Sequence, residues 1–216
     1  MPDFDHQRRT MVDGQLRTYD VTQAGLLAAF GAVPREEFVN IAQRSTAYVD
    51  QPQRLGGSRA LPAPMVLARL IQAAEIEPGD RVLEVGCGTG YGAAVLTALG
   101  ASVVALESDP ELADRAKVCL AAAGAAATVV TGPLRAGWAE LGPFDAIVMN
   151  GSFETEPSEL LSQLREGGRL VGVRGVGRSA RAMLYRRAGG HSSGRPVFDA
   201  AAPILPGFEA APAFSF

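Results

Sequence analysis

Hydrophobic positions follow two different patterns along this chain of 216 residues, and the pattern changes near residue 80. In the N-terminal part, apolar residues have helical spacing over residues 22–30 and 65–74, and Pro34 followed by charged residues 35–37 is typical of a helix start. Residues 51–64 contain three prolines and two adjacent glycines without periodicity, which predicts a loop. We therefore expect an N-terminal helical cap followed by a substrate loop.

From residue 81 onwards, short apolar runs alternate with amphipathic stretches, as in βαβ units on a parallel sheet. Strands are expected over residues 81–85, 102–106, 127–131, 144–149 and 168–173, and helices over residues 91–99, 110–123 and 156–165. A sixth strand over residues 180–186 has no crossover helix before it, which favours an antiparallel direction. The tail from residue 189 is rich in Gly, Pro and Ala, and the alternation over residues 212–216 suggests an edge strand.

The predicted fold class is α/β: a Rossmann-like, doubly wound, mostly parallel sheet with helices on both faces and an N-terminal helical cap. We expect one compact unit, with the cap and substrate loop in residues 1–78 and the cofactor-binding core in residues 79–216. Residues 1–64 are expected to pack over the carboxyl ends of the strands and to close the crevice there, since the crevice would otherwise be open to water.

Composition narrows the class of protein. With 47% hydrophobic and 20% charged residues and no apolar run of about 18 residues, the chain is expected to be a soluble globular protein. The charged first ten residues lack the apolar segment of a secretory signal, which favours the cytoplasm.

Cys87 and Cys119 are expected to be reduced thiols, and the two histidines stand in no metal-binding cluster, so no metal is expected. A net charge of −3 without a Lys/Arg stripe disfavours nucleic acid as a partner.

A glycine-rich loop follows the first predicted strand. Gly86, Gly88 and Gly90 are spaced G-x-G-x-G around Cys87 and Thr89, and Glu84 precedes them. Glycines let a ligand approach the backbone closely, and the next helix presents free N–H groups. The dinucleotide fingerprint needs its third glycine where this chain has Tyr91, which disfavours nicotinamide and flavin cofactors. A nucleoside without a pyrophosphate fits better, and with Glu84 near a cationic amino-acid end the pattern indicates S-adenosylmethionine.

Glu107 ends the second predicted strand, about 20 residues after the loop, where a carboxylate accepts both ribose hydroxyls of a nucleoside. Gly132, after the third strand, is expected to contact the cofactor as well. Asn150, after the fourth strand, faces the same crevice, where it either binds substrate or caps the strand. The alternative is that the glycines only form a tight turn and Glu107 is a solvated charge at a strand end.

Several further motifs resemble those of the protein-L-isoaspartate O-methyltransferases. The resemblance runs from residue 11 to about residue 177 and rests on residues 11–17 (MVDGQLR), 33–39 (VPREEFV), 47–50 (AYVD), 137–138 (GW), 142–147 (GPFDAI) and 163–171 (QLREGGRLV). It implies S-adenosyl-L-methionine as methyl donor and the carboxylate of an isoaspartyl residue in a damaged protein or peptide as acceptor. It also implies a role in protein repair, with neither a metal nor a membrane as partner.

The chain departs from this family in the segment that holds the acceptor carboxylate. Where the family has Gln-Thr-Ile-Ser, this chain has Arg59-Ala60-Leu61-Pro62, so both hydroxyls are missing. Arg59 is a candidate catalytic and substrate-binding residue, because a guanidinium binds a carboxylate bidentately; the alternative is a solvated loop charge. Ser58 is the nearest hydroxyl and a second substrate-binding candidate.

A second departure follows the third strand, where the family's Gly-Asp is replaced by Gly132-Pro133, which removes an acceptor for the adenine amino group. Three hypotheses therefore stand. The first is a methyltransferase of the isoaspartyl type that turns over weakly. The second is an S-adenosylmethionine-dependent methyltransferase with another acceptor, such as a small molecule, another peptide or RNA. The third is a cofactor-binding interaction protein without transfer activity.

Overall fold

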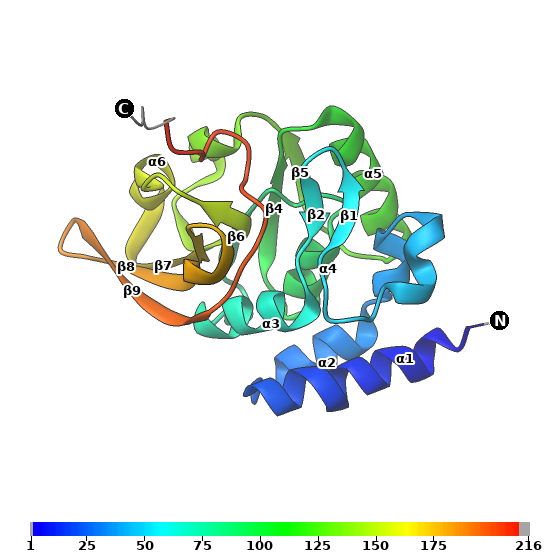
Figure 1. The fold of residues 1–216 in the computed structure, drawn as a ribbon. Helices are drawn as coiled ribbons and strands as arrows, with labels where there is room; N and C mark the ends of the chain where they lie inside the picture. The colour runs from blue at the N-terminus through cyan, green and yellow to red at the C-terminus, as the bar shows by residue number, and fades with distance from the viewer. Residues whose placement is uncertain (1, 212–216) are drawn as a thin grey trace, which may run out of the picture.

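The computed structural model describes residues 2–211 and contains one large sheet with the strand order β5-β4-β3-β6-β7-β8-β9 (Figure 1). The five neighbouring strands from β5 to β7 in this order run parallel, whereas β8 and β9 each pair antiparallel with the strand before them. The bounds are β3 (Arg81–Val85), β4 (Ser102–Glu107), β5 (Thr128–Thr131), β6 (Phe144–Phe153), β7 (Leu164–Arg174), β8 (Arg181–Ala188) and β9 (His191–Asp199). The predicted mostly parallel α/β fold and the antiparallel sixth strand are confirmed.

Helices α3 (Pro64–Ala73), α4 (Tyr91–Ala98) and α5 (Pro110–Ala122) cover one face of this sheet, and α6 (Ser158–Ser162) with two short 3-10 helices, Leu134–Ala136 and Ala139–Leu141, covers the other. The strand period of two decides which residues meet which layer. In β3, Val82 packs with the α3–α5 layer, and Leu83 and Val85 pack with the α6 layer. Glu84 therefore points to the same side as Val82, toward α4.

The N-terminal helices lie below the main body in Figure 1 and extend the α3–α4 layer. Helix α1 (Phe4–Met11) continues through a π-helical turn, Val12–Leu16, and a 3-10 turn, Arg17–Tyr19, before α2 (Ala24–Ala32). Phe30 of α2 packs edge to face on Tyr91 of α4, with ring centroids 6.0 Å apart. The expectation that all of residues 1–64 cover the carboxyl ends of the strands is therefore wrong for α1 and α2, and only the later part of that segment reaches them.

The later part of the segment starts with the short helices η3 (Arg35–Phe38) and η4 (Ile41–Thr46) and ends in a hairpin of β1 (Gln53–Gly56) and β2 (Arg59–Leu61). The two strands pair antiparallel, with Arg54 opposite Ala60. Gly57, at φ +52°, forms the turn in a conformation that glycine adopts without strain. The predicted loop over residues 51–64 is thus wrong in part, because a Gly-Gly-Ser turn pairs the two short flanking runs.

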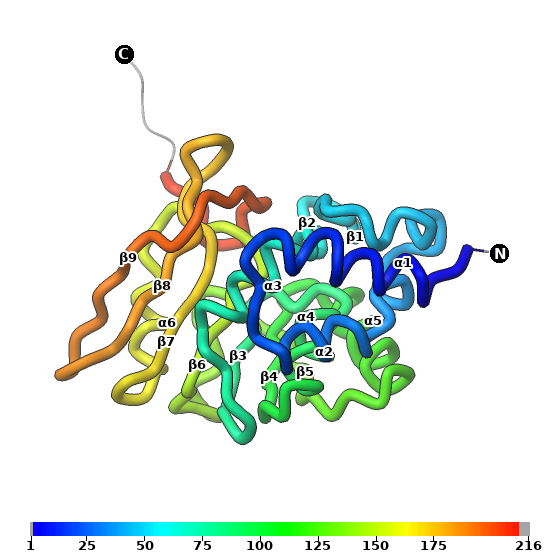
Figure 2. The backbone as a smooth tube through the Cα atoms, turned by 90° about the horizontal axis from the view of Figure 1, so that it is seen from below, coloured from blue at the N-terminus to red at the C-terminus, as the bar shows by residue number. Residues whose placement is uncertain are grey.

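Other boundaries differ from the predicted ones. Helix α6 is shorter than the predicted helix over residues 156–165, and β6 and β7 are longer than predicted. Strand β9 was not predicted in the Gly-rich tail; glycines 189 and 190, both with positive φ, turn the chain back so that β9 pairs with β8 (Figure 2). The edge strand predicted for residues 212–216 lies outside the described residues. Within residues 2–211, no helix combines the length and apolarity needed to cross a membrane.

Candidate active site

The glycine loop lies between the carboxyl end of β3 and the start of α4, as its sequence predicts. Gly86, Gly88 and Gly90 all have positive φ, at +76°, +59° and +89°. The backbone N–H groups of Gly86 and Cys87 donate to the carbonyl of Leu106 on β4, at 2.8 and 3.0 Å. The loop is thereby fixed to the neighbouring strand at the edge of the crevice beyond the sheet.

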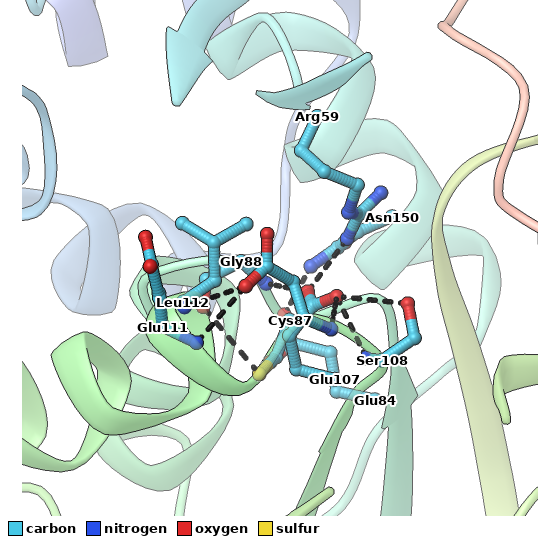
Figure 3. Close-up of polar contacts among 10 residues, drawn as sticks. Arg59, Glu84, Cys87, Gly88, Glu107, Ser108, Glu111, Leu112 and Asn150 are labelled. Atoms are coloured by element: carbon cyan, nitrogen blue, oxygen red, sulfur yellow. Dashed lines mark hydrogen bonds and ion pairs between the residues drawn. The ribbon is translucent and has the colours of Figure 1, made fainter. Parts of the chain in front are cut away.

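Glu107, the last residue of β4, is fully buried and forms the polar centre of the site (Figure 3). Its Oε2 accepts from the backbone N–H of Gly88 at 2.7 Å. Its Oε1 accepts from the N–H groups of Ser108 and Asp109, at 2.8 and 3.2 Å. These donors hold the carboxylate at the edge of the glycine loop, so the solvated strand-end alternative is excluded for Glu107.

Glu84 is a residue of β3 and lies beneath α4. It is fully buried, accepts a hydrogen bond from Asn150 Nδ2, and touches the position that a Cβ on Gly92 would occupy. Its second oxygen, Oε2, and the Oδ1 of Asn150 have no partner. Burial raises the pKa of Glu84 to about 8, and the Asn150 hydrogen bond opposes this shift without cancelling it. Asn150 lies within β6, which continues to Phe153, so its amide binds Glu84 and does not cap a strand end.

Three side chains cover the glycine loop. A Cβ on Gly86 would lie 2.8 Å from Arg59 Nη2 and 2.7 Å from Leu205 Cδ2, and a Cβ on Gly88 would lie 2.6 Å from Leu55 Cδ1. Arg59 and Leu55 come from the β1–β2 hairpin, and Leu205 comes from the tail, whose Leu205 N–H donates to the carbonyl of Ser152 at 2.9 Å. Segments from both ends of the chain therefore meet over the loop.

Arg59 does not lie in solvent. Its side chain is 7% exposed and points down from β2 to Glu107, with Nη2 2.7 Å from Oε2 (Figure 3). The alternative reading of Arg59 as a solvated loop charge is thus wrong, and the predicted cofactor residue Glu107 and the predicted substrate residue Arg59 bind each other. Next to them, a cleft of about 510 Å³ lies between the hairpin and Pro203, and Ser58, Arg59 and Ala60 line it.

The other residues predicted to bind the cofactor contact other parts of the protein. The Thr89 hydroxyl donates to the carbonyl of Phe38 and so ties the η3 segment to the loop. Cys87 is buried, and this burial raises the pKa of its thiol. Gly90 packs on Leu120 of α5, and Gly132 packs on the ring of Trp138. Of the predicted cofactor set, Glu84, Gly86, Gly88 and Glu107 gather at one place, whereas the side chain of Thr89 and the outer face of Gly90 point elsewhere.

Arg35 is a site residue whose role the sequence did not reveal. It is fully buried, donates from Nε to the carbonyl of Ala47 at 2.8 Å and from Nη2 to that of Pro62 at 2.7 Å, and lies over the ring of Tyr91 at 4.7 Å. Arg35 therefore anchors the end of the hairpin to α4 and η4. A charged residue just after Pro34 is typical of an exposed helix start, so nothing local predicts this burial.

Comparisons with known proteins agree with this geometry. The family model of protein-L-isoaspartate(D-aspartate) O-methyltransferase matches residues 7–198. A protein-L-isoaspartate O-methyltransferase of Methylorubrum populi is 42% identical over 167 residues, which cover 77% of this chain and 79% of that protein. One of Gloeobacter violaceus is 43% identical over 162 residues, which cover 74% of this chain and 79% of that protein.

Solved structures show the same fold. One protein-L-isoaspartate O-methyltransferase superimposes with a TM-score of 0.80 and 25% identity over 93% of this chain and 66% of its own. A Plasmodium falciparum structure, described as a putative protein-L-isoaspartate O-methyltransferase in complex with S-adenosyl-L-homocysteine, superimposes with a TM-score of 0.78 and 19% identity over 92% of this chain and 97% of its own. The chain therefore belongs to the protein-L-isoaspartate(D-aspartate) O-methyltransferase family of S-adenosylmethionine-dependent methyltransferases.

Proposed function

We propose that this protein binds S-adenosylmethionine across Gly86 to Gly90 and methylates the carboxylate of isoaspartyl residues in damaged proteins, with low turnover. The observation that carries the cofactor site is the buried Glu107 carboxylate, which Gly88 N–H holds beside a loop that contains three glycines. A carboxylate so placed accepts two adjacent hydroxyls, as the ribose of a nucleoside offers. The isoaspartyl acceptor follows from family membership.

The residues present fit this cofactor in their chemistry. Glu107 would accept from the ribose hydroxyls. Glu84 Oε2 and Asn150 Oδ1, which have no partner, would accept from the cationic amino-acid end, whose charge favours the ionised form of Glu84. In space, the fit requires the ends of the Arg59, Leu55 and Leu205 side chains to move from the loop. These are flexible side chains, and the backbone of the loop itself is open to approach.

When bound, S-adenosylmethionine supplies an electrophilic methyl group. The acceptor carboxylate is already a nucleophile, so this chain needs no general base and must only align that carboxylate and exclude water. The buried Leu55 and Leu205, from two separate segments, would exclude water around the crevice. Arg59 lines the neighbouring cleft, and its guanidinium would be the donor that orients the acceptor carboxylate.

Low turnover follows from the hairpin. Ala60 lies in β2 opposite Arg54, and the Pro62 carbonyl accepts from Arg35, so the segment over residues 59–62 offers no side-chain hydroxyl to a substrate. Each well-aimed donor to a reacting oxyanion contributes about 3 kcal/mol in comparable sites. The loss of two such donors predicts turnover several orders of magnitude below that of a hydroxyl-bearing relative, except where Arg59 compensates.

Two measurements test the proposal. Calorimetric titration with S-adenosylhomocysteine should show binding to the wild type and at least tenfold weaker binding to Glu107→Gln, which keeps the volume and removes the charge. A labelled-methyl assay should then show slow transfer to an isoaspartyl peptide and none to the matched aspartyl peptide. An unchanged affinity in a folded Glu107→Gln variant would remove the cofactor assignment, and equal transfer to both peptides would remove the acceptor.

One observation favours the third hypothesis, an interaction protein without transfer activity: the loop is covered by Arg59, Leu55 and Leu205, and Glu107 already has a cationic partner. In that case the labelled-methyl assay would show no transfer to the isoaspartyl peptide, even where calorimetry shows that S-adenosylhomocysteine binds. Transfer to that peptide by the wild type or by a Leu55→Ala, Leu205→Ala double variant would favour the enzyme.

A further inference from the structure

Arg59 and Glu107 form an ion pair that is almost completely removed from water, with side chains 7% and 0% exposed. Only the Nη2 of Arg59 has a partner in the pair, and its buried Nε has none. A buried charge pair of this kind is strongly destabilised when one member loses the other. The position of Arg59 is therefore set by Glu107, which lies 48 residues away in sequence.

The same pair closes the cofactor crevice. Glu107 Oε2 receives both Gly88 N–H and Arg59 Nη2, and the guanidinium lies where a Cβ on Gly86 would be. A ligand and Arg59 therefore cannot bind Glu107 at the same time. S-adenosylmethionine is itself a cation, so a guanidinium left beside it would repel it.

The hairpin offers Arg59 a second position. Arg59 lines the cleft of about 510 Å³ that lies between the hairpin and Pro203. Gly57 of the hairpin turn also lines this cleft, in a backbone conformation with φ of +52° that glycine adopts without strain. A guanidinium released from Glu107 would have this cleft beside it, where a carboxylate would satisfy its charge and its free Nε.

We infer that Arg59 is a two-position latch: it binds Glu107 and closes the crevice in the free protein, and a ligand on Glu107 displaces it into the cleft, where it binds the acceptor carboxylate. The inference rests on the proposed cofactor site and deepens it. Because the closed position competes with the ligand, Arg59 lowers cofactor affinity. Because the displaced position serves the acceptor, cofactor and acceptor bind cooperatively, each raising the affinity of the other by the same factor.

Calorimetry with S-adenosylhomocysteine tests the closed position without any turnover. Arg59→Ala should bind the ligand at least about tenfold more tightly than the wild type, since one charge-assisted hydrogen bond no longer competes. Arg9→Ala is the matched control, because Arg9 is an exposed arginine of α1 that does not line the cleft, and its affinity should stay within about twofold of the wild type. Should Arg59→Ala fail to fold by circular dichroism, Arg59→Gln takes its place with the same expectation.

The second position is tested by repeating the titration with saturating isoaspartyl peptide. The peptide should raise the affinity for S-adenosylhomocysteine in the wild type, and Arg59→Ala should lose this coupling. An affinity in Arg59→Ala equal to or below that of the wild type refutes the latch, and a missing coupling in the wild type refutes the second position. If no folded variant binds S-adenosylhomocysteine, the proposed function itself fails, which is a different result.

Discussion

Glu84 gives the structure a pH dependence that its sequence does not show. The carboxyl is fully buried beneath α4, with one oxygen bound to Asn150 Nδ2 and the other without a partner. Burial disfavours the ionised form and raises the pKa to about 8. Glu84→Gln replaces this carboxyl by a neutral side chain of the same size, so it removes the titration and leaves the packing intact.

The sign follows from proton linkage. The folded protein holds a proton on Glu84 up to about pH 8, whereas the unfolded chain releases it near the ordinary value of 4.5. Between these values the folded state binds more protons, so the free energy of unfolding falls as pH rises. One proton contributes at most about 1.4 kcal/mol per pH unit, so the stability lost between pH 5 and pH 8 has an upper limit of about 4 kcal/mol.

Urea unfolding at pH 5, 6, 7 and 8 measures this effect in the ligand-free protein. The wild type should lose stability across the series, and Glu84→Gln should lose less and be the more stable protein at pH 8. Glu140→Gln, at an exposed glutamate, should follow the wild type. Equal slopes for the wild type and Glu84→Gln would refute the reasoning, because the carboxyl would then be ionised in both states.

Two further predictions concern the hairpin. Arg35→Met should lower the free energy of unfolding by about 2–6 kcal/mol, because it leaves the Ala47 and Pro62 carbonyls buried without a donor, at about 1–3 kcal/mol each. Urea unfolding checks this, and a loss no larger than that of the exposed Arg54→Met would contradict it. The double variant Ala60→Thr, Pro62→Ser should raise methyl transfer to an isoaspartyl peptide at least tenfold, by restoring two donors. Unchanged turnover with unchanged affinity for S-adenosylhomocysteine would show that the pocket serves another acceptor.

Local sequence determined the core of this protein. Hydrophobic periodicity predicted strands β3 to β8 and helices α3 to α5, because these elements satisfy their own hydrogen bonds and expose one apolar side to a neighbouring layer. The spacing of Gly86, Gly88 and Gly90 with the acid Glu107 identified the loop and its partner strand, since both belong to one βαβ unit. The motifs over residues 11–171 indicated the family that the comparisons confirm.

Local pattern was less informative where pairing depends on a turn. A glycine turn joins β1 to β2, and another joins β8 to β9. The hairpin strands and β9 are poor in apolar residues, so the alternation of apolar and polar residues was too weak to reveal them. Both pair with a neighbour in sequence, and their turn residues, Gly56-Gly57-Ser58 and Gly189-Gly190, were the available signal.

Tertiary structure alone decided the state of the site. The contacts that cover the glycine loop join residues far apart in the chain: Arg59 to Glu107 across 48 positions, Leu55 to Gly88, and Leu205 to Gly86. Arginine in a glycine- and proline-rich stretch is usually solvated, and only the buried, otherwise unpaired charge of Glu107 makes burial of this one favourable. The burial of Glu84 and Arg35 has the same origin, because desolvation depends on the layers that pack around a side chain and not on its neighbours in sequence.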